Sequence, residues 1–148
     1  MRFSAILGAG LLAAGAASAA VVDKPSPHSV AETIDRLEAA VGKAGASVVA
    51  RVDHAGAAEK AGLEMRPAEL LIFGNPKVGT PLMQAEMAMT VVLPLRVAAY
   101  EDVDGQVIVV YENIADVAEV YGVDPQSEAV TAIAGALDKL TGAAVAAD

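Results

Sequence analysis

Apolar residues recur at helical spacing near the start of the chain. Val30, Ile34, Leu37 and Val41 are three or four positions apart, which places them on one face of a helix. A Ser-x-x-Glu capping box begins at Ser29, where the hydroxyl can accept a hydrogen bond from the backbone amide three residues later. The pattern predicts a helix over residues 29–43.

Further along, apolar residues stand at consecutive or alternating positions in short runs that turn residues separate. These runs predict strands over residues 21–24, 47–52, 68–73, 93–100 and 106–111. Between and after them, helical spacing and capping residues predict helices over residues 55–61, 80–90, 113–121 and 127–141. The Asp-Gly loop at 102–105 predicts a hairpin between the fourth and fifth strands. We expect the helix at 80–90 to begin at Thr80 with Pro81 in its first turn.

The order of strand, helix, several strands and final helix favours an α+β fold. Antiparallel strands pair into one sheet, and the helices pack on one face of that sheet. Several strands are apolar at consecutive positions, as in Leu70-Leu71-Ile72-Phe73 and Val107 to Val110. A sheet with one solvated face should instead alternate polar with apolar residues. Either inserted helices or a second subunit must cover the other face, and we predict a homodimer.

The N-terminal residues have the order of a secretory signal peptide. Arg2 precedes an uncharged apolar run over residues 6–17, and Ala17-Ser18-Ala19 is a small-x-small cleavage pattern. The run is shorter than the roughly 20 residues that span a bilayer. We therefore expect a signal peptide over residues 1–19, one α+β domain over 20–148 and a periplasmic or secreted location. An uncleaved N-terminal anchor is the alternative.

Composition narrows the classes of function. The chain has 19 acidic and 10 basic residues, and loss of Arg2 with the signal peptide brings the net charge from −9 to −10. Such a charge works against binding nucleic acid or an anionic membrane surface. Cysteine is absent, which excludes disulfides and thiolate metal sites.

Several segments together resemble domain-of-unknown-function family 302, over residues 22 to about 141. The segments are Ser26-Pro27-His28-Ser29-Val30-Ala31-Glu32-Thr33, Arg51-Val52-Asp53-His54, Glu69-Leu70-Leu71-Ile72-Phe73-Gly74-Asn75-Pro76, Gly79-Thr80-Pro81-Leu82-Met83, Leu93-Pro94-Leu95-Arg96, and Glu101-Asp102 with Gly105. The resemblance implies a β-α-β(4)-α arrangement like that of the TATA-binding-protein fold class, in a small bacterial or archaeal domain that often occurs as a dimer. It implies neither a reaction nor catalytic residues.

One candidate site lies at the end of the second and third predicted strands. If these strands pair antiparallel, Asp53, His54, Arg66 and Glu69 gather at one end of the sheet. A histidine beside a carboxylate with an arginine nearby can orient a proton transfer or hold a carboxylate ligand. The alternative is structural: Asp53 and His54 cap the next helix, and Arg66 pairs with Glu69.

A second candidate lies at the opposite end of the sheet, where Asn75, Lys77 and Thr80 stand in a glycine-bearing loop before a helix. Free amides at a helix N-terminus favour anions, and Lys77 would add positive charge. The spacing is not that of a phosphate-binding P-loop. Such loops also serve simply to turn the chain.

These features favour a non-enzymatic binding or assembly domain, with no cofactor. Its partner would be a small apolar or weakly anionic molecule, or another envelope protein. One alternative is a small hydrolase- or isomerase-like enzyme that uses His54 with a carboxylate. Another is a metal carrier, which would need His28 and His54, the two histidines, to converge on one ion. We expect these histidines to lie apart and predict no metal site.

Overall fold

The computed structural model describes residues 20–148. The predicted signal peptide at 1–19 therefore lies outside the described residues. The elements follow in the order β1 (Val21–Ser26), α1 (Val30–Lys43), β2 (Ser47–Asp53), α2 (His54–Lys60), β3 (Ala68–Gly74), α3 (Pro76–Ala85), the 3₁₀ helix η1 (Met87–Val91), β4 (Leu95–Glu101), β5 (Val107–Glu112), α4 (Ile114–Val120) and α5 (Glu128–Ala144).

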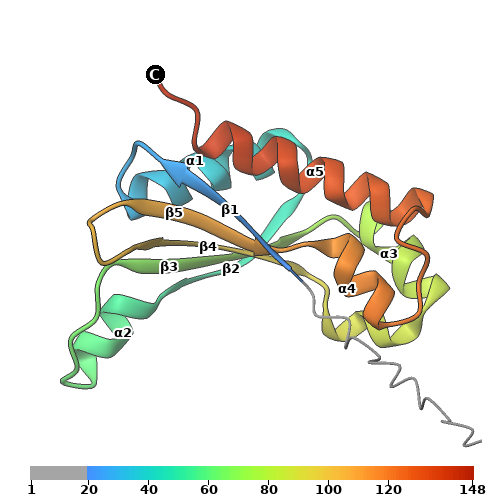
Figure 1. Ribbon diagram of the computed structural model, residues 1–148, viewed down its shortest axis with the longest axis horizontal. Coiled ribbons are helices and arrows are strands. Elements are labelled where there is room, and N and C mark those ends of the chain that lie inside the picture. The colour runs from blue at the N-terminus through green and yellow to red at the C-terminus, as the bar shows by residue number, and fades with distance from the viewer. Residues whose placement is uncertain (1–19) are drawn as a thin grey trace, which may run out of the picture.

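The strands form one antiparallel sheet in the order β1-β5-β4-β3-β2 (Figure 1). The first strand thus pairs with the last, and β2 lies at the opposite edge. In the register of β3 and β4, Leu71 stands opposite Val97 and Glu69 opposite Ala99. The predicted hairpin joins β4 to β5, and Gly105 in its turn has a φ of 80°, which suits glycine. The α+β class and the β-α-β(4)-α order are both confirmed.

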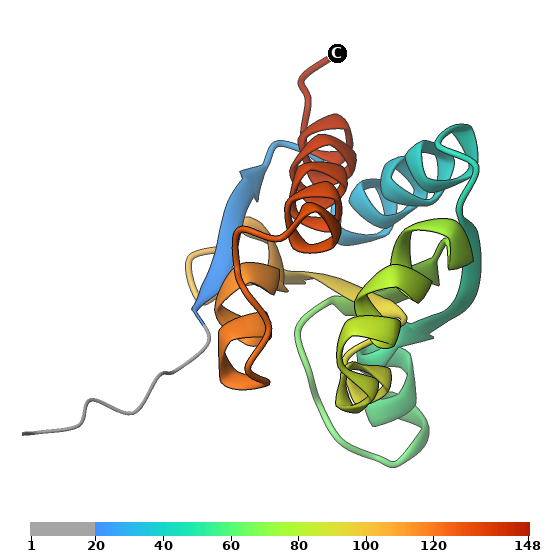
Figure 2. The same cartoon turned by 90° about the vertical axis from the view of Figure 1, so that its right-hand side faces the viewer.

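Helices α1 and α5 lie side by side over one face of this sheet (Figures 1 and 2). Helix α1 begins as predicted, because the Ser29 side chain accepts a hydrogen bond from the Glu32 amide. Its apolar stripe is buried against Leu71, Phe73 and Val97 of the sheet in a single core cluster. Burial of such side chains stabilises a fold by roughly 1.5–3 kcal/mol each.

The first strand is longer than predicted. The predicted strand covers residues 21–24, yet β1 continues to Ser26, and Pro25 stands opposite Ile108 of β5. Proline is tolerated here because β1 is an edge strand, with no partner strand on one side of its backbone.

The start of the third helix is also different. Helix α3 begins at Pro76, four residues before the predicted cap at Thr80, and Pro81 lies inside it. The N-cap is Asn75, whose side chain accepts a hydrogen bond from the Lys77 amide at 3.0 Å. Asn-Pro and Thr-Pro are both good start signals, and the chain uses the earlier one. The helix ends at Ala85, and η1 covers the rest of the predicted span.

The sheet face opposite α1 and α5 is apolar and half-buried. Its central row joins Leu70, Ala98 and Val110 across β3, β4 and β5. In Figure 1 this face lies below the sheet, with α2 beside one end of it. Within residues 20–148, no helix combines the length and the apolar character needed to cross a membrane.

Candidate functional site

An apolar cleft of about 470 Å³ opens at the end of the sheet where β2 begins and β3 ends. Figure 2 faces this end of the molecule, where α3 packs against α5. The turn after α1, the first residues of β2, helix α3, the segment before β4 and helix α5 all contribute to the wall. Its residues are Ala44, Ala46, Ser47, Val49, Phe73, Gly74, Asn75, Pro76, Val78, Gly79, Thr80, Met83, Leu93, Pro94, Leu95, Ile133, Ala136 and Leu140.

The chemistry of the cleft wall is almost entirely apolar. None of its side chains carries a charge, and only Ser47, Asn75 and Thr80 have polar side chains. The Asn75 side chain is already engaged, because its oxygen caps α3 and its nitrogen donates to the Gly45 carbonyl at 3.4 Å. A concave site of this size, with apolar walls and few polar groups, is typical of sites for small molecules.

Of the three residues predicted as an anion site at this end of the sheet, two line the cleft and one does not. Asn75 and Thr80 line the cleft, whereas Lys77 is exposed and does not. The expected free amides are also occupied. The Lys77 amide donates to the Asn75 side chain, and the amides of Val78 and Gly79 both donate to the Asn75 carbonyl at 2.9 Å. Pro76 has no amide hydrogen to offer. The N-terminus of α3 therefore offers an anion little beyond its dipole.

At the opposite end, β2 and β3 pair antiparallel as expected, with Asp53 opposite Glu69. Asp53 acts as the N-cap of α2, accepting a hydrogen bond from the Gly56 amide at 2.8 Å. A side chain at Gly56 would overlap this carboxylate. His54, the first residue of α2, is exposed. The geometry favours the structural alternative for Asp53.

Glu69 pairs with Arg51 and not with Arg66, so this part of the structural alternative is wrong. The Nε atom of Arg51 lies 2.6 Å from Glu69 Oε2, and its Nη1 also bonds Asp35 on α1. Hydrogen bonds to Glu69 and then Asp35 raise the pKa of Arg51 above its ordinary value, so the cluster is held by a permanent positive charge. Arg66 instead donates to the Glu101 carbonyl at 3.1 Å.

A second, polar groove of about 600 Å³ lies beside this cluster, between the start of α1, α2 and the edge of β3. Five carboxylates line it and no basic side chain does. They belong to Asp53, Glu59, Glu64, Glu69 and Glu101. His54 is not among the lining residues, so the groove lacks the histidine that the enzymatic alternative requires.

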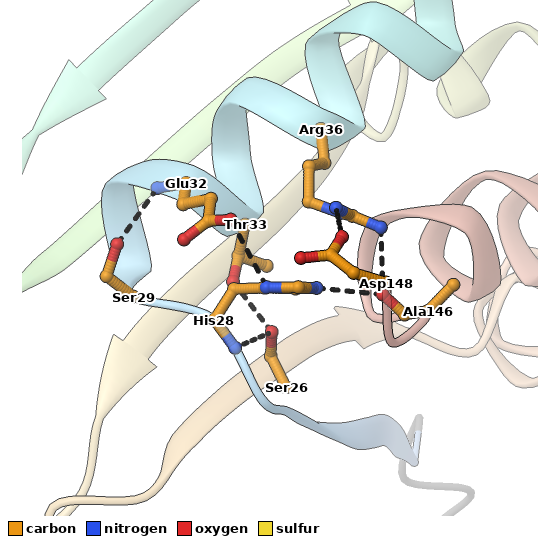
Figure 3. A network of polar contacts seen from close by, with 8 residues as sticks. All are labelled: Ser26, His28, Ser29, Glu32, Thr33, Arg36, Ala146 and Asp148. Carbon is orange, nitrogen blue, oxygen red and sulfur yellow. Dashed lines mark hydrogen bonds and ion pairs between the residues drawn. The ribbon is translucent and has the colours of Figure 1, made fainter.

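His28 lies in a separate polar region, where β1 leads into α1 (Figure 3). Its Nδ1 is 3.3 Å from Glu32 Oε1, and its Nε2 is 2.8 Å from the Ala146 carbonyl oxygen. Arg36 also reaches this segment, bonding the Ala146 carbonyl and Asp148, each at 2.8 Å. Together these contacts fasten the C-terminal segment to α1.

The same region holds three potential metal ligands, from His28, Glu32 and Asp148, whose ligand atoms lie within 4.8 Å of one another. His54 is not part of this group, so the two histidines do not converge as a metal carrier would require. The Asp148 carboxylate is already paired with the Arg36 guanidinium, and a neighbouring positive charge disfavours a divalent cation. These residues fit a metal ion poorly.

Sequence reasoning missed most of the cleft. Phe73, Leu93 and Ile133 were expected only as parts of strands and helices, because their pattern is that of any core residue. Nothing local distinguishes an apolar side chain that lines a cleft from one that fills the core. The one available signal was Asn75 with Thr80, which was interpreted as an anion site.

Two comparisons with known proteins cover most of the chain. The model of the family described as "Domain of unknown function DUF302" matches residues 22–143. The crystal structure of an uncharacterised conserved DUF302 protein from Bacillus stearothermophilus has a TM-score of 0.68 and 18% sequence identity, covering 84% of this chain and 94% of that one. At this identity the likeness concerns the fold alone.

Part of the chain is also similar to proteins named "Fluoride-specific ion channel FluC 1". Those of Brucella suis and Brucella abortus are each 48% identical over 87 residues, or 59% of this chain. The match covers 34% and 32% of their respective lengths. The chain therefore spans about a third of these relatives, and most of each relative has no counterpart in the alignment.

Proposed function

We propose that this chain, which belongs to the DUF302 family, is a non-enzymatic binding domain that holds a small apolar molecule in the cleft beside α3. The observation that carries the proposal is the cleft itself, with its volume of about 470 Å³ and its uncharged walls. Sites for small molecules usually have volumes of roughly 300–1,000 Å³, with mostly apolar walls.

The positions of the titratable side chains support binding over catalysis. General acid–base chemistry needs a titratable side chain within reach of the substrate, and the cleft wall contains none. At the other end of the sheet, Asp53 caps a helix and Glu69 is bound by Arg51. His54 is exposed there and lines neither cavity.

A matched pair of substitutions on α5 tests the site. Ala136 lines the cleft between Ile133 and Leu140, whereas Ala132 is exposed on the same helix. Ala136→Phe should fill the cleft and abolish binding of a neutral fluorescent probe such as N-phenyl-1-naphthylamine. Ala132→Phe should leave it unchanged. Equal binding by both variants would place the probe elsewhere and refute the proposal.

The proposal includes a homodimer that forms through the open face of the sheet. The apolar residues on this face are Ala50, Val52, Leu70, Ile72, Ala98, Ile108 and Val110. Their half-burial in one chain supports a second copy as the cover, because large contiguous apolar patches are rare on monomers. Charge on this face comes from Arg96 and Glu112, which pair at 3.0 Å, and from Asp23 of β1, which stands opposite Val110.

Light scattering at micromolar concentration tests the dimer. Ala98 lies at the centre of the face, so Ala98→Lys should produce monomers. Val103 is also exposed but lies in the turn between β4 and β5, and Val103→Lys should leave the dimer intact. A monomeric wild-type protein would refute this part of the proposal.

We also propose that the domain works in the periplasm or outside the cell, after cleavage behind Ala19. Recovery of the protein from a periplasmic or culture fraction, with Ala20 as its first residue, is the expected result. Native mass spectrometry of that material reports subunit number and any retained ligand together. Retention in the cytoplasmic fraction would contradict export.

A membrane partner is a second candidate, which one observation favours. The relatives in two Brucella species carry the similar segment within proteins named fluoride-specific ion channels. We propose that this domain assists such a channel. If so, substituting this domain for the matching segment in the Brucella suis protein should preserve fluoride efflux from proteoliposomes. Loss of efflux in a correctly folded chimera would count against the idea.

A further inference from the structure

We infer that the cleft selects uncharged chain molecules, such as a long-chain alcohol, and rejects the corresponding carboxylates. The inference rests on the proposed binding function and narrows its ligand class. It departs from the expectation of a weakly anionic ligand, which depended on free amides and a lysine at the start of α3.

The first argument is that no positive charge faces the cleft. Every residue in its wall is uncharged. The basic residues that directly adjoin wall residues in the sequence are Lys43, Lys77, Arg96 and Lys139. All four are exposed and none lines the cleft. A carboxylate bound inside would therefore lose its hydration without gaining a counter-ion, which is strongly unfavourable.

The second argument is that the backbone donors of α3 are already used. Its first turn has no free amide, because the Asn75 side chain and carbonyl accept from Lys77, Val78 and Gly79. A helix N-terminus binds an anion through such amides together with the dipole. With its donors occupied, this one can offer only the weaker, solvent-screened dipole.

The third argument concerns the polar side chains of the cleft wall other than that of Asn75. Ser47 and Thr80 are the two wall residues whose side chains carry a hydroxyl. Each hydroxyl can donate one hydrogen bond and accept others. Either one suits a neutral polar group, such as an alcohol or an amide, at the end of an apolar chain.

The test compares three ligands that share a dodecyl chain and differ in charge. They are dodecanol, kept below its aqueous solubility, and dodecanoate and dodecyltrimethylammonium, each kept below its micelle concentration, all at pH 8. Displacement of N-phenyl-1-naphthylamine from the exported protein reports their affinities. Dodecanol should bind at least tenfold more tightly than either ion, which corresponds to about 1.4 kcal/mol. Ala136→Phe should abolish its binding, and Ala132→Phe should not.

The possible failures are distinct. If neither the probe nor any dodecyl ligand binds, the proposed binding function is wrong and this inference falls with it. If dodecanoate matches dodecanol, the cleft binds chains but the charge selection is refuted. In that case Lys77→Gln identifies the cause, because an eightfold or larger loss of dodecanoate affinity in this variant would assign anion binding to Lys77. We expect instead that Lys77→Gln prefers dodecanol over dodecanoate by the same factor as the wild-type protein.

Discussion

Replacement of Arg51 by methionine should destabilise the fold more than any other single charge removal on the sheet. Arg51 bonds Glu69 and Asp35, lies 3.6 Å from Glu38 and donates to the Ala31 carbonyl at 3.3 Å. It thereby fastens α1 to the edge of the sheet. Without it, the Glu69 carboxylate loses its ion-pair partner with only 15% of its side chain exposed, opposite Asp53 on the neighbouring strand.

The magnitude follows from the burial of the pair. Removing one partner of a fully buried ion pair costs about 3–5 kcal/mol. The Arg51 side chain is 30% exposed, so we expect a smaller loss, about 2.5 kcal/mol. Unfolding entropy is about 2.1 cal/mol/K per residue, or about 0.27 kcal/mol/K for the domain over residues 20–148. The expected fall in melting temperature is therefore about 9 °C.

Circular dichroism during thermal and urea unfolding measures the change, since the chain has no tryptophan. Arg66→Met is the matched control, because Arg66 makes one exposed hydrogen bond to a carbonyl and should cost about 0.5 kcal/mol. The double variant Arg51→Met with Glu69→Leu should recover more than half of the loss, because it leaves no buried charge unpaired.

Two results would refute this reasoning. A loss below about 1 kcal/mol for Arg51→Met would mean that the cluster behaves as an ordinary surface ion pair. A double variant no more stable than the single one would mean that the loss does not come from the unpaired Glu69 carboxylate.

Three further substitutions test other parts of the structure. Leu71→Ala, at a fully buried position, should lower the free energy of unfolding in urea by about 3 kcal/mol. Leu63→Ala, at a position that is two-thirds exposed, should lower it by less than about 0.5 kcal/mol. Similar losses in the two variants would contradict the placement of the core. Asp53→Ala should cost about 1 kcal/mol through the lost cap of α2 and speed hydrogen exchange there first, whereas unchanged exchange would exclude a capping role. His28→Ala should speed carboxypeptidase trimming of the C-terminal segment, and His54→Ala should not. Equal rates would refute the role of His28 in holding that segment to α1.

The elements that sequence predicted well depend on neighbouring residues. The Ser29 cap, the apolar stripe of α1 and the Asp-Gly turn after β4 act within a few positions of one another. Their physical causes, hydrogen bonds to nearby amides and helical periodicity, can be read directly from the chain. The same holds for the α+β class, because the order of such elements restricts how they can pack.

Local signals failed where two of them competed. Asn75-Pro76 and Thr80-Pro81 both resemble helix starts, and sequence favoured the second. In the structure α3 begins at the first, so that Val78 and Thr80 both face the cleft. The choice also used up the amides on which the predicted anion site depended. A one-turn difference in a helix start thus changed the chemistry expected of the site.

Contacts between distant residues were decided by the tertiary structure alone. Glu69 could pair with Arg51 or Arg66, and only the position of α1, which brings Asp35 to the same guanidinium, selects Arg51. The cleft is a stronger case, because its wall combines residues from Ala44 to Leu140. The sequence by itself determined which residues are apolar and which elements they form. Whether an apolar side chain fills the core or lines a cleft depends on how closely α3 and α5 approach the sheet, and that distance is set by the packing of the whole domain.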